Sequence, residues 1–274
     1  MNKYQSEFLD EICNKSTNIH NNIPLPLEIE ISLVDKCNRK CIFCPRYDDK
    51  IAPNTDLIIP KKLYEKISRE LKVLKFKGLI VLGGYGEPLL HKNILEISKL
   101  FSFANTIITT NGDFLTKELA KSLQNVGIKK ILVSIYEKRV ISRLLAIQEE
   151  LKDFIVLRNR YSKNMSSLNF TNNRAGTLNK KHLNQKCYYP FYMIMIDSNG
   201  DVLTCCHDWN RHYKIGNLWQ NTIWECWNSP LIKKMRNQFT NNNSIRIISP
   251  CNSCDVNGTL RGKNNYDLFN SQET

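Results

Sequence analysis

The sequence predicts an α/β protein, in which a mostly parallel sheet with packed helices is followed by a smaller hairpin-plus-helix module. Strands and helices of ordinary length alternate from residue 27 to about residue 157, as in βαβ units. A polar linker ends the alternation near residue 177, and six of the ten cysteines follow residue 186. We therefore expect three parts: an N-terminal arm (1–26), an α/β domain (27–176) and a cysteine-rich module (177–274).

The elements of the α/β domain can be assigned in order. An apolar run over 27–34 predicts the first strand. Pro60 suits the first turn of a helix that runs to about Leu74. The elements that follow are a strand over 78–82, a helix over 91–101, a strand over 105–110, a helix over 116–126, a strand over 129–135, a helix over 138–151, a strand over 154–157 and a weak sixth strand over 167–170.

The last module has its own pattern. Two apolar runs around Asn199 and Gly200 predict a β-hairpin over 192–205. Thr222 and Glu225 form a capping box for a helix that we expect to continue to about Phe239.

The composition excludes several classes of protein. The chain has 274 residues, of which 42% are hydrophobic and 24% charged, and no apolar run is long enough for a membrane span. Its first residues lack a signal-peptide core, so we expect a cytoplasmic protein, where ten cysteines favour metal binding over disulfides. The net charge is +13, but the basic residues are scattered and form no aromatic-interleaved stripe, which argues against a nucleic-acid partner.

Three cysteines follow the first strand directly. Cys37, Cys41 and Cys44 have the spacing C-x3-C-x2-C. Three thiolates from one loop can hold three irons of a [4Fe–4S] cube and leave the fourth iron open to a substrate or cofactor. A structural zinc site would need a fourth cysteine or histidine. No histidine lies in this loop, so we favour an open cluster over a zinc knuckle or buried structural thiols.

A second set of cysteines surrounds the predicted hairpin and helix. Its members are Cys187, Cys205, Cys251 and Cys254. A sulfur before the hairpin, one at its end and a C-x2-C pair after the helix could enclose one metal centre. The spacing alone leaves zinc open as that metal.

The first cysteine loop resembles the signature of the radical S-adenosylmethionine (SAM) enzymes. The resemblance implies a partial (β/α)6 barrel with its chemistry at the carboxyl ends of the strands. It also implies that Cys37, Cys41 and Cys44 ligate a [4Fe–4S] cluster that binds SAM, with Phe43 near the adenine. One electron from the cluster would cleave SAM to a 5′-deoxyadenosyl radical, which abstracts hydrogen from the substrate.

Polar turns after the next strands extend this resemblance. Residues 83–88 resemble the family's Gly-Gly-Glu-Pro element, in which Gly84 and Gly86 permit close backbone approach and Glu87 balances the SAM ammonium. Three further residues are candidates for ribose or carboxylate contacts: Thr110, Asn111 and Ser134. For each element a plain turn at a strand end is the alternative.

The second cysteine set resembles the twitch domain, a shortened SPASM domain. The resemblance implies one auxiliary [4Fe–4S] cluster, with Cys205 rather than its neighbour Cys206 as the hairpin ligand. We expect no second auxiliary cluster, because little chain follows Cys254. Of the remaining cysteines, Cys13 is expected to be incidental and Cys226 a buried structural thiol.

Residues 173–176, Asn-Arg-Ala-Gly, and the cysteine layout resemble the aminocyclitol dehydrogenases of this family, the 2-deoxy-scyllo-inosamine dehydrogenase type. The resemblance implies that Arg174 faces the substrate. We therefore predict oxidation of a secondary alcohol on a sugar or aminocyclitol to a ketone, with the auxiliary cluster as electron acceptor. Arg174 or His207 would help to remove the hydroxyl proton. Thr109, Cys206 and His207 depart from that type and leave the substrate open.

Other functions remain as alternatives. Cys206 could return a hydrogen atom from the opposite face, which would make the protein an epimerase of the same substrates. A peptide-modifying maturase would usually carry a leader-binding domain, and residues 1–26 are too short to supply one. A non-catalytic metal-binding or nucleic-acid module ranks last. The partners that we expect are a small-molecule substrate of the sugar or cyclitol type and a reducing electron donor such as flavodoxin or ferredoxin, with no membrane.

Overall fold

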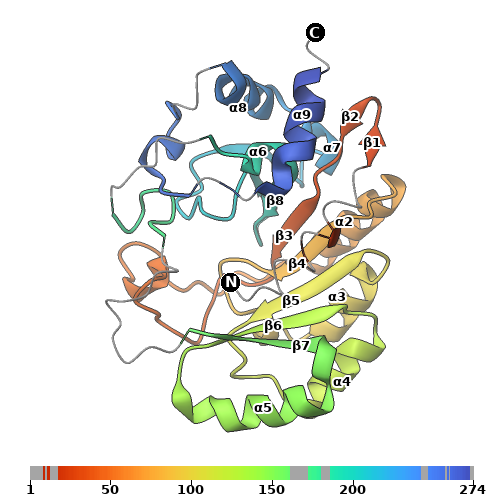
Figure 1. Ribbon diagram of the computed structural model, residues 1–274, viewed down its shortest axis with the longest axis vertical. Helices are drawn as coiled ribbons and strands as arrows, with labels where there is room; N and C mark the ends of the chain where they lie inside the picture. The colour runs from red at the N-terminus through yellow and green to blue at the C-terminus, as the bar shows by residue number, and fades with distance from the viewer. Residues whose placement is uncertain are drawn as a thin grey trace.

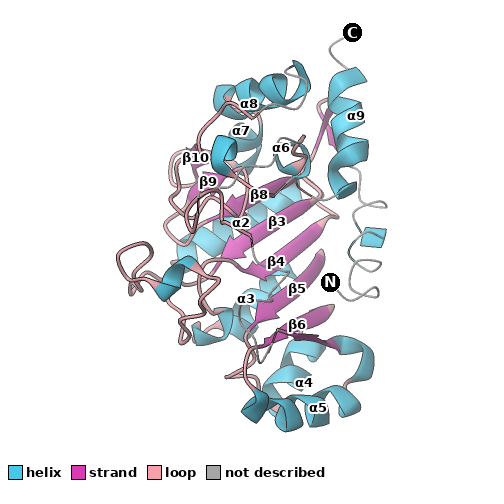
Figure 2. Cartoon of the chain, turned by 60° about the vertical axis from the view of Figure 1, so that its left-hand side comes forward, coloured by secondary structure: helices cyan, strands magenta, loops and turns pink. Residues whose placement is uncertain are grey.

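One eight-stranded sheet runs through the computed structural model (Figures 1 and 2). The structure describes residues 9, 11, 12, 18–160, 172–179, 186–241, 246–256, 258 and 260–271. The strand order is β10-β9-β8-β3-β4-β5-β6-β7. The strands are β3 (Glu28–Ser32), β4 (Leu79–Gly83), β5 (Asn105–Thr110), β6 (Lys130–Ile135), β7 (Ile155–Asn159), β8 (Met193–Ile196), β9 (Asp201–Leu203) and β10 (Lys214–Asn217), and a separate ribbon pairs β1 (Ile19–His20) with β2 (Ile23–Pro24).

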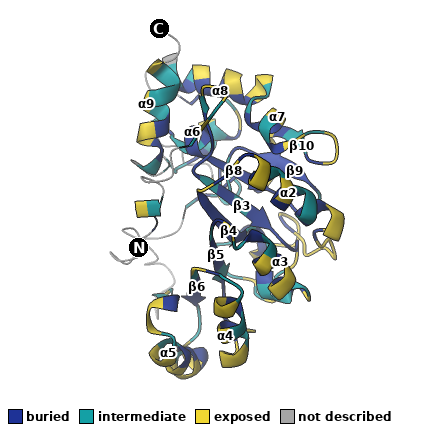
Figure 3. Ribbon diagram, turned by 90° about the vertical axis from the view of Figure 1, so that its right-hand side faces the viewer, coloured by how far each residue is buried: buried dark blue, intermediate teal, exposed yellow. Residues whose placement is uncertain are grey.

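The parallel part of the sheet confirms the predicted α/β pattern. Strands β3 to β7 pair side by side in parallel register. Helices α2 (Lys61–Val73), α3 (Ile94–Phe101), α4 (Lys117–Asn125) and α5 (Ile141–Glu150) alternate with them and cover one face (Figure 2). Their outward sides are exposed, whereas the strands are buried (Figure 3). The predicted sixth strand over 167–170 lies outside the described residues.

Side-chain alternation along β3 separates the core from the site. Ile29 and Ile31 face the helices and join the main hydrophobic core. Glu28 and Ser32 lie on the other face together with Glu30, since successive side chains of a strand point to opposite faces. The polar residues of this strand therefore lie on the face of the sheet opposite to the helices.

The predicted hairpin is present, and it extends the same sheet. Strand β8 pairs in parallel with β3, and β9 returns antiparallel to β8. Strand β10 then adds antiparallel to β9. The C-terminal module is thus joined to the α/β domain through backbone hydrogen bonds.

The single helix predicted from Thr222 to about Phe239 is wrong. The chain forms two helices instead, α7 (Ile223–Trp227) and α8 (Pro230–Asn241). Pro230 has no backbone N–H and cannot continue the preceding helix, so it begins a new one. The capping box of Thr222 and Glu225 is confirmed at the start of α7.

Two further helices complete the module, α6 (Tyr189–Tyr192) and α9 (Lys263–Ser271). Asn265 of α9 donates hydrogen bonds to the carbonyl oxygens of Leu25 and Phe191. None of the described helices has the length and hydrophobicity needed to cross a membrane.

Candidate active site

A cavity of about 370 Å³ lies at the carboxyl ends of the parallel strands. It brings together twelve of the predicted site residues, which are Cys37, Cys41, Cys44, Phe43, Gly84, Gly86, Glu87, Thr110, Asn111, Ser134, Arg174 and Cys206. Thr109 also lines it. This is the end of a parallel sheet where ligands of α/β proteins bind.

The cysteine loop is fixed by side-chain amides. Asn54 exchanges two hydrogen bonds with the backbone of Cys37, at 2.9 and 3.0 Å. The Cys44 N–H donates to the Cys41 carbonyl at 2.9 Å, which closes a tight turn between these two cysteines. Asn111 points an amide N–H at the Cys37 sulfur from 3.8 Å. An N–H donor to sulfur favours the thiolate, which is the form that a metal cluster requires.

An ion-pair network that the sequence did not reveal ties this loop to two strand ends. Arg39, between two of the cysteines, donates to both carboxylate oxygens of Asp113 and to Glu137 at 2.7 Å. Burial raises the pKa of Asp113, but the hydrogen bond and charge of Arg39 outweigh it and hold that pKa below its usual value. Arg39 thus joins the cysteine loop to the turns that follow β5 and β6.

Two glycines let the loops approach. Gly84 has φ +89°, and a Cβ there would lie 2.7 Å from the Cβ of Ser32. A Cβ on Gly86 would lie 2.2 Å from the carbonyl oxygen of Val34 and 2.6 Å from that of Lys36. The Glu87 N–H donates to the same Lys36 carbonyl at 2.9 Å. The glycine-rich turn is therefore held against the cysteine loop by its backbone.

Glu87 links the turns that follow β4 and β5. Its carboxylate accepts hydrogen bonds from the Thr110 hydroxyl at 2.6 Å, the Asn111 N–H at 2.9 Å and the Leu89 N–H at 3.1 Å. Burial raises the pKa of Glu87, and the three donors oppose that rise. Its position at the cavity wall remains compatible with a cationic group of a ligand.

Glu30 is a site residue that the sequence reasoning missed. It lines the cavity from β3, and the Cys206 thiol and the Gly84 N–H donate to it. Burial, reinforced by the nearby charge of Glu28, raises the pKa of Glu30 to about 7. Charged residues at alternate positions of an apolar strand were the available signal, because such a strand is normally apolar throughout. A carboxyl group that titrates near neutrality can exchange protons at the pH of the cell.

A strained turn carries Arg174 into the cavity. Arg174 and Ala175 have positive φ values of 50° and 52°, and Gly176 has 81°. The side chain of Asn173 holds the turn, since it accepts from the Gly176 N–H and donates to the Ser253 carbonyl at 2.6 Å. The Ala175 N–H donates to the Cys254 sulfur. The loop of the last two cysteines thus positions Arg174.

The second cysteine set lines a small cavity of its own. Cys187, Cys205, Cys251 and Cys254 all contribute to its wall. N–H groups of His207 and Val256 donate to the sulfurs of Cys205 and Cys254, at 3.2 and 3.4 Å. The guanidinium of Arg246, which the sequence reasoning also missed, is buried beside them. Burial raises the pKa of the Cys187 thiol to about 11, and the Arg246 charge opposes that rise.

The spacing of these sulfurs helps to distinguish a zinc ion from an iron–sulfur cluster. No three His, Cys, Asp or Glu side chains of the described chain are placed so that they could hold a single metal ion. A tetrahedral zinc ion needs its sulfurs about 2.3 Å from one centre, whereas the sulfurs around a [4Fe–4S] cube lie farther apart. The donor sets of both cavities fit iron–sulfur clusters in number and chemistry.

His207 does not lie where the sequence reasoning expected it. It lines the second cavity rather than the first, and its Nε2 lies 3.2 Å from the Tyr189 hydroxyl. Burial, reinforced by the nearby charge of Arg174, lowers the pKa of His207 to about 3. The two cysteines that were expected to ligate no cluster are Cys13 and Cys226. Cys226 is buried in the core, as predicted, and Cys13 lies outside the described residues.

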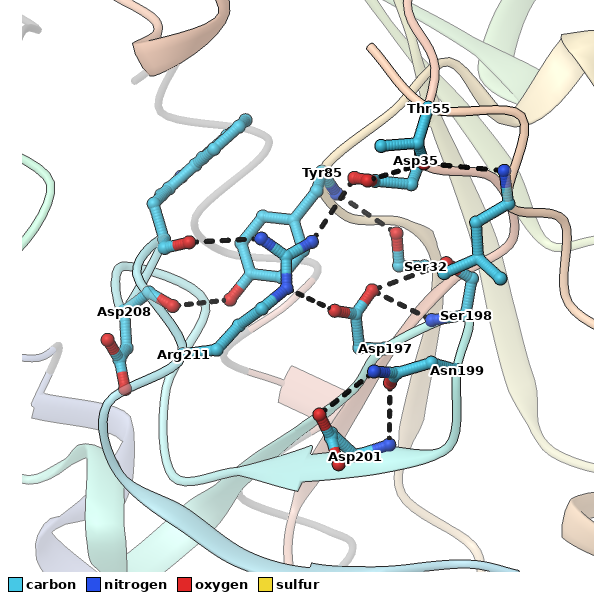
Figure 4. A network of polar contacts seen from close by, with 12 residues as sticks. Ser32, Asp35, Thr55, Tyr85, Asp197, Ser198, Asn199, Asp201, Asp208 and Arg211 are labelled. Carbon is cyan, nitrogen blue, oxygen red and sulfur yellow. Dashed lines mark hydrogen bonds and ion pairs between the residues drawn. The ribbon is translucent and has the colours of Figure 1, made fainter. Parts of the chain in front are cut away.

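A polar network joins the cysteine loop to the C-terminal module (Figure 4). Asp35 accepts from Arg211 at 3.1 Å and from the Thr55 hydroxyl at 2.9 Å. Arg211 also pairs with Asp197, which follows β8. The Tyr85 hydroxyl donates to the Asp208 carbonyl at 2.8 Å. Side-chain hydrogen bonds and ion pairs therefore tie the two modules together beside Tyr85, which lines the cavity.

Two family models match the parts of the chain that build the two cavities. The model of the radical SAM superfamily matches residues 31–136. The SPASM model, described as an iron–sulfur cluster-binding domain, matches residues 187–255. Radical SAM domains bind a [4Fe–4S] cluster together with SAM, and SPASM domains bind auxiliary clusters, so the cofactor prediction agrees with both matches.

Comparison with individual proteins gives the same assignment. An S-adenosyl-L-methionine-dependent 2-deoxy-scyllo-inosamine dehydrogenase from Niallia circulans is 27% identical over 87% of this chain and 96% of its own. A GTP 3′,8-cyclase from Aquifex aeolicus is 39% identical but matches only 40% of this chain and 36% of its own length. The crystal structure of BtrN in complex with AdoMet and 2-DOIA superposes with a TM-score of 0.75 at 27% identity, covering 85% of this chain and 94% of that chain. The chain therefore carries a radical SAM domain over residues 31–136 and a C-terminal SPASM-type iron–sulfur domain over residues 187–255.

Proposed function

We propose that this protein is a radical SAM dehydrogenase that oxidises a secondary alcohol of a sugar or aminocyclitol to a ketone. One observation carries the proposal: the two cavities share a wall. Arg174 and Cys206 line the first cavity, and their chain neighbours Ala175 and Cys205 line the second. A substrate in the first cavity would thus lie beside the second cysteine set, where an electron acceptor is needed.

The site residues would hold the cofactors as follows. Cys37, Cys41 and Cys44 would ligate the SAM-binding cluster, and Cys187, Cys205, Cys251 and Cys254 the auxiliary one. When bound, SAM and its cluster supply the 5′-deoxyadenosyl radical that removes a hydrogen atom from the carbinol carbon. Phe43, Gly84, Gly86, Glu87, Thr110, Asn111 and Ser134 would bind and orient SAM.

Loss of a hydroxyl proton must accompany oxidation, and Glu30 is the group placed to accept it. Its pKa of about 7 suits a general base. Arg174 would bind the hydroxyl and favour its deprotonated form. We do not assign the base role to His207, which faces the other cavity and hydrogen-bonds to Tyr189.

A second candidate function rests on Cys206. Its thiol lines the substrate cavity and contacts Glu30, so it could return a hydrogen atom and leave an inverted alcohol. The thiyl radical left on Cys206 would then take an electron from the flavodoxin- or ferredoxin-class donor and a proton from solvent, so the outcome is epimerisation without net oxidation of the substrate.

Product analysis in deuterated buffer tests both functions. The enzyme would be loaded with iron, sulfide and SAM, reduced, and given candidate sugars and aminocyclitols. A ketone formed one-for-one with 5′-deoxyadenosine supports oxidation, whereas an inverted alcohol that carries deuterium supports epimerisation. Cys206→Ala should abolish only the second outcome.

The proposed reaction also requires an electron donor and a reducing compartment. A low-potential donor of the flavodoxin or ferredoxin class would supply the electron that starts each turnover. We place the protein in the cytoplasm, where unpaired cysteines remain reduced and available for iron.

A further inference from the structure

We propose that the substrate carries an anionic group, a phosphate or a carboxylate, and that Arg158, Arg160 and Arg174 bind it. The proposal rests on the proposed function, because that function makes the first cavity the substrate cavity. It narrows the substrate class from sugars and aminocyclitols in general to their acidic derivatives.

Three arginines that are not paired with Asp113 or Glu137 line the first cavity. Arg158 is the register partner of Ser134 on β6, and both line the cavity. Arg160 follows two residues later, on the same side of the chain, and its N–H donates to the Ile135 carbonyl at 2.8 Å. Arg174 reaches the cavity from the turn that Asn173 holds.

Among the described residues of the cavity wall, arginines outnumber carboxylates, and the acid whose charge acts on both Arg158 and Arg174 is Glu30. The only carboxylates of the described chain that line the cavity are Glu30 and Glu87. Glu87 already accepts three hydrogen bonds. A fourth arginine, Arg39, also lines the cavity, but it forms ion pairs with Asp113 and Glu137. We therefore do not include it among the arginines that would bind the anion.

Arg158 shows the imbalance most clearly. Its buried Nε has no hydrogen-bond partner, and the acid whose charge acts on it, Glu30, also interacts with the charge of Arg174. Burial lowers the pKa of Arg158 to about 10, so it is still charged at neutral pH. The Nε of Arg174 is also buried without a partner. A buried guanidinium is costly unless an anion pairs with it.

SAM alone does not account for the three arginines. Its methionyl part brings a single carboxylate, which one arginine can bind bidentately. The remaining guanidinium groups face the space where a substrate would bind. A substrate with a free amino group would be repelled there, whereas a phosphate or carboxylate would be attracted.

A set of sugars that differ in charge tests the inference. Glucose 6-phosphate, glucuronate, glucose and glucosamine, together with inorganic phosphate, would be titrated anaerobically into the cluster-loaded protein with SAM bound. We expect at least one of the two acidic sugars to bind about tenfold more tightly than glucose, with glucosamine weakest, and the preference to shrink in high salt. Tighter binding of glucose 6-phosphate assigns a phosphate, and tighter binding of glucuronate assigns a carboxylate.

Arginine variants give the matched comparison. Arg160→Gln and Arg174→Gln should each remove most of the preference, and Arg69→Gln, on the exposed side of α2, should keep it. Iron content and SAM binding of each variant show that it remains folded. Equal affinities, a preference for glucosamine, or no binding of any acidic probe at millimolar concentration would overturn the inference. Cleavage of SAM, measured in parallel, separates the outcomes, since a protein that cannot cleave SAM refutes the proposed function whatever it binds.

Discussion

Glu30 shows how one residue can be tuned by its surroundings. Burial disfavours its charged form, and Glu28 adds repulsion, whereas Cys206, Gly84 and Arg174 favour the charge. The balance raises its pKa to about 7. Below that pH the carboxyl is protonated and cannot accept a proton, and above it the carboxylate can.

Replacement of Glu30 by Gln should therefore lower kcat about 100-fold or more, because general-base assistance is lost. The wild-type kcat/KM should rise with pH through about 7, and this acid limb should disappear in the variant. The measurement is ketone formation from pH 5.5 to 8.5, with Glu149→Gln on the exposed side of α5 as control. A variant that keeps the acid limb would show that another group titrates.

The two glycines at the end of β4 offer a second test at this scale. Gly86→Ala places a methyl group 2.2 Å from the Val34 carbonyl oxygen, so the cysteine loop must move. We expect a loss of about 1–3 kcal/mol in stability and weakened SAM binding. In Gly83→Ala the nearest atom lies 3.5 Å away, which makes it the matched control. Equal SAM affinity in both variants would contradict the close-approach argument.

At the scale of elements, the turn over 173–176 connects the two cavities. Asn173 is fully buried, and its side chain accepts from the N–H groups of Gly176 in the turn and Asp255 in the last cysteine loop and donates to the Ser253 carbonyl of that loop. The left-handed backbone of Arg174 and Ala175 is unfavourable for these residues unless it is held. A change in the loop of Cys251 and Cys254 should thus alter the position of Arg174 in the first cavity.

Asn173→Ala should weaken catalysis without removing a cluster. The variant keeps every cysteine but loses one hydrogen bond within the turn and two that join the turn to the last cysteine loop, so Arg174 is held less precisely. We expect KM to rise several-fold and kcat to fall, with unchanged iron content. Asn252→Ala, on the exposed part of the same loop, is the control. Loss of iron in Asn173→Ala would show instead that the turn supports the cluster itself.

The sequence allowed most of the elements to be predicted, for physical reasons that differ between them. Strand and helix periodicity located β3 to β7 and α2 to α5, and C-x-x-C spacing pointed to both metal sites. Pro230 was the visible signal for the broken helix, and the capping pattern at Thr222 obscured it. The pairing of β8 with β3 could not be read from local pattern, because it joins strands far apart in the chain. The same holds for Glu30, Arg158 and Arg246, whose significance depends on what faces them.

At the scale of the whole molecule, the shared sheet and the polar network of Figure 4 join the α/β domain to the C-terminal module. Strand β8 continues the parallel sheet, and Arg211 bridges Asp35 beside the cysteine loop and Asp197 beside the hairpin. The cavities of the two modules are nevertheless separate and lined by different cysteines. Each cluster should therefore be removable without the other.

Iron content tests that expectation. Wild-type protein reconstituted without oxygen should hold about eight irons, and the Cys37/Cys41/Cys44→Ala variant about four, since each cubane contains four. A Cys251/Cys254→Ala variant should also retain about four, now in the SAM-binding site, and should still bind SAM.

Mössbauer spectra and zinc analysis distinguish the alternatives. If the wild type holds about four irons, the first triple variant holds none, and one zinc remains in both, the second cavity is a zinc site. An ion without redox chemistry could not take the second electron. That result would exclude oxidation with an auxiliary acceptor, leave SAM cleavage intact, and favour epimerisation through Cys206.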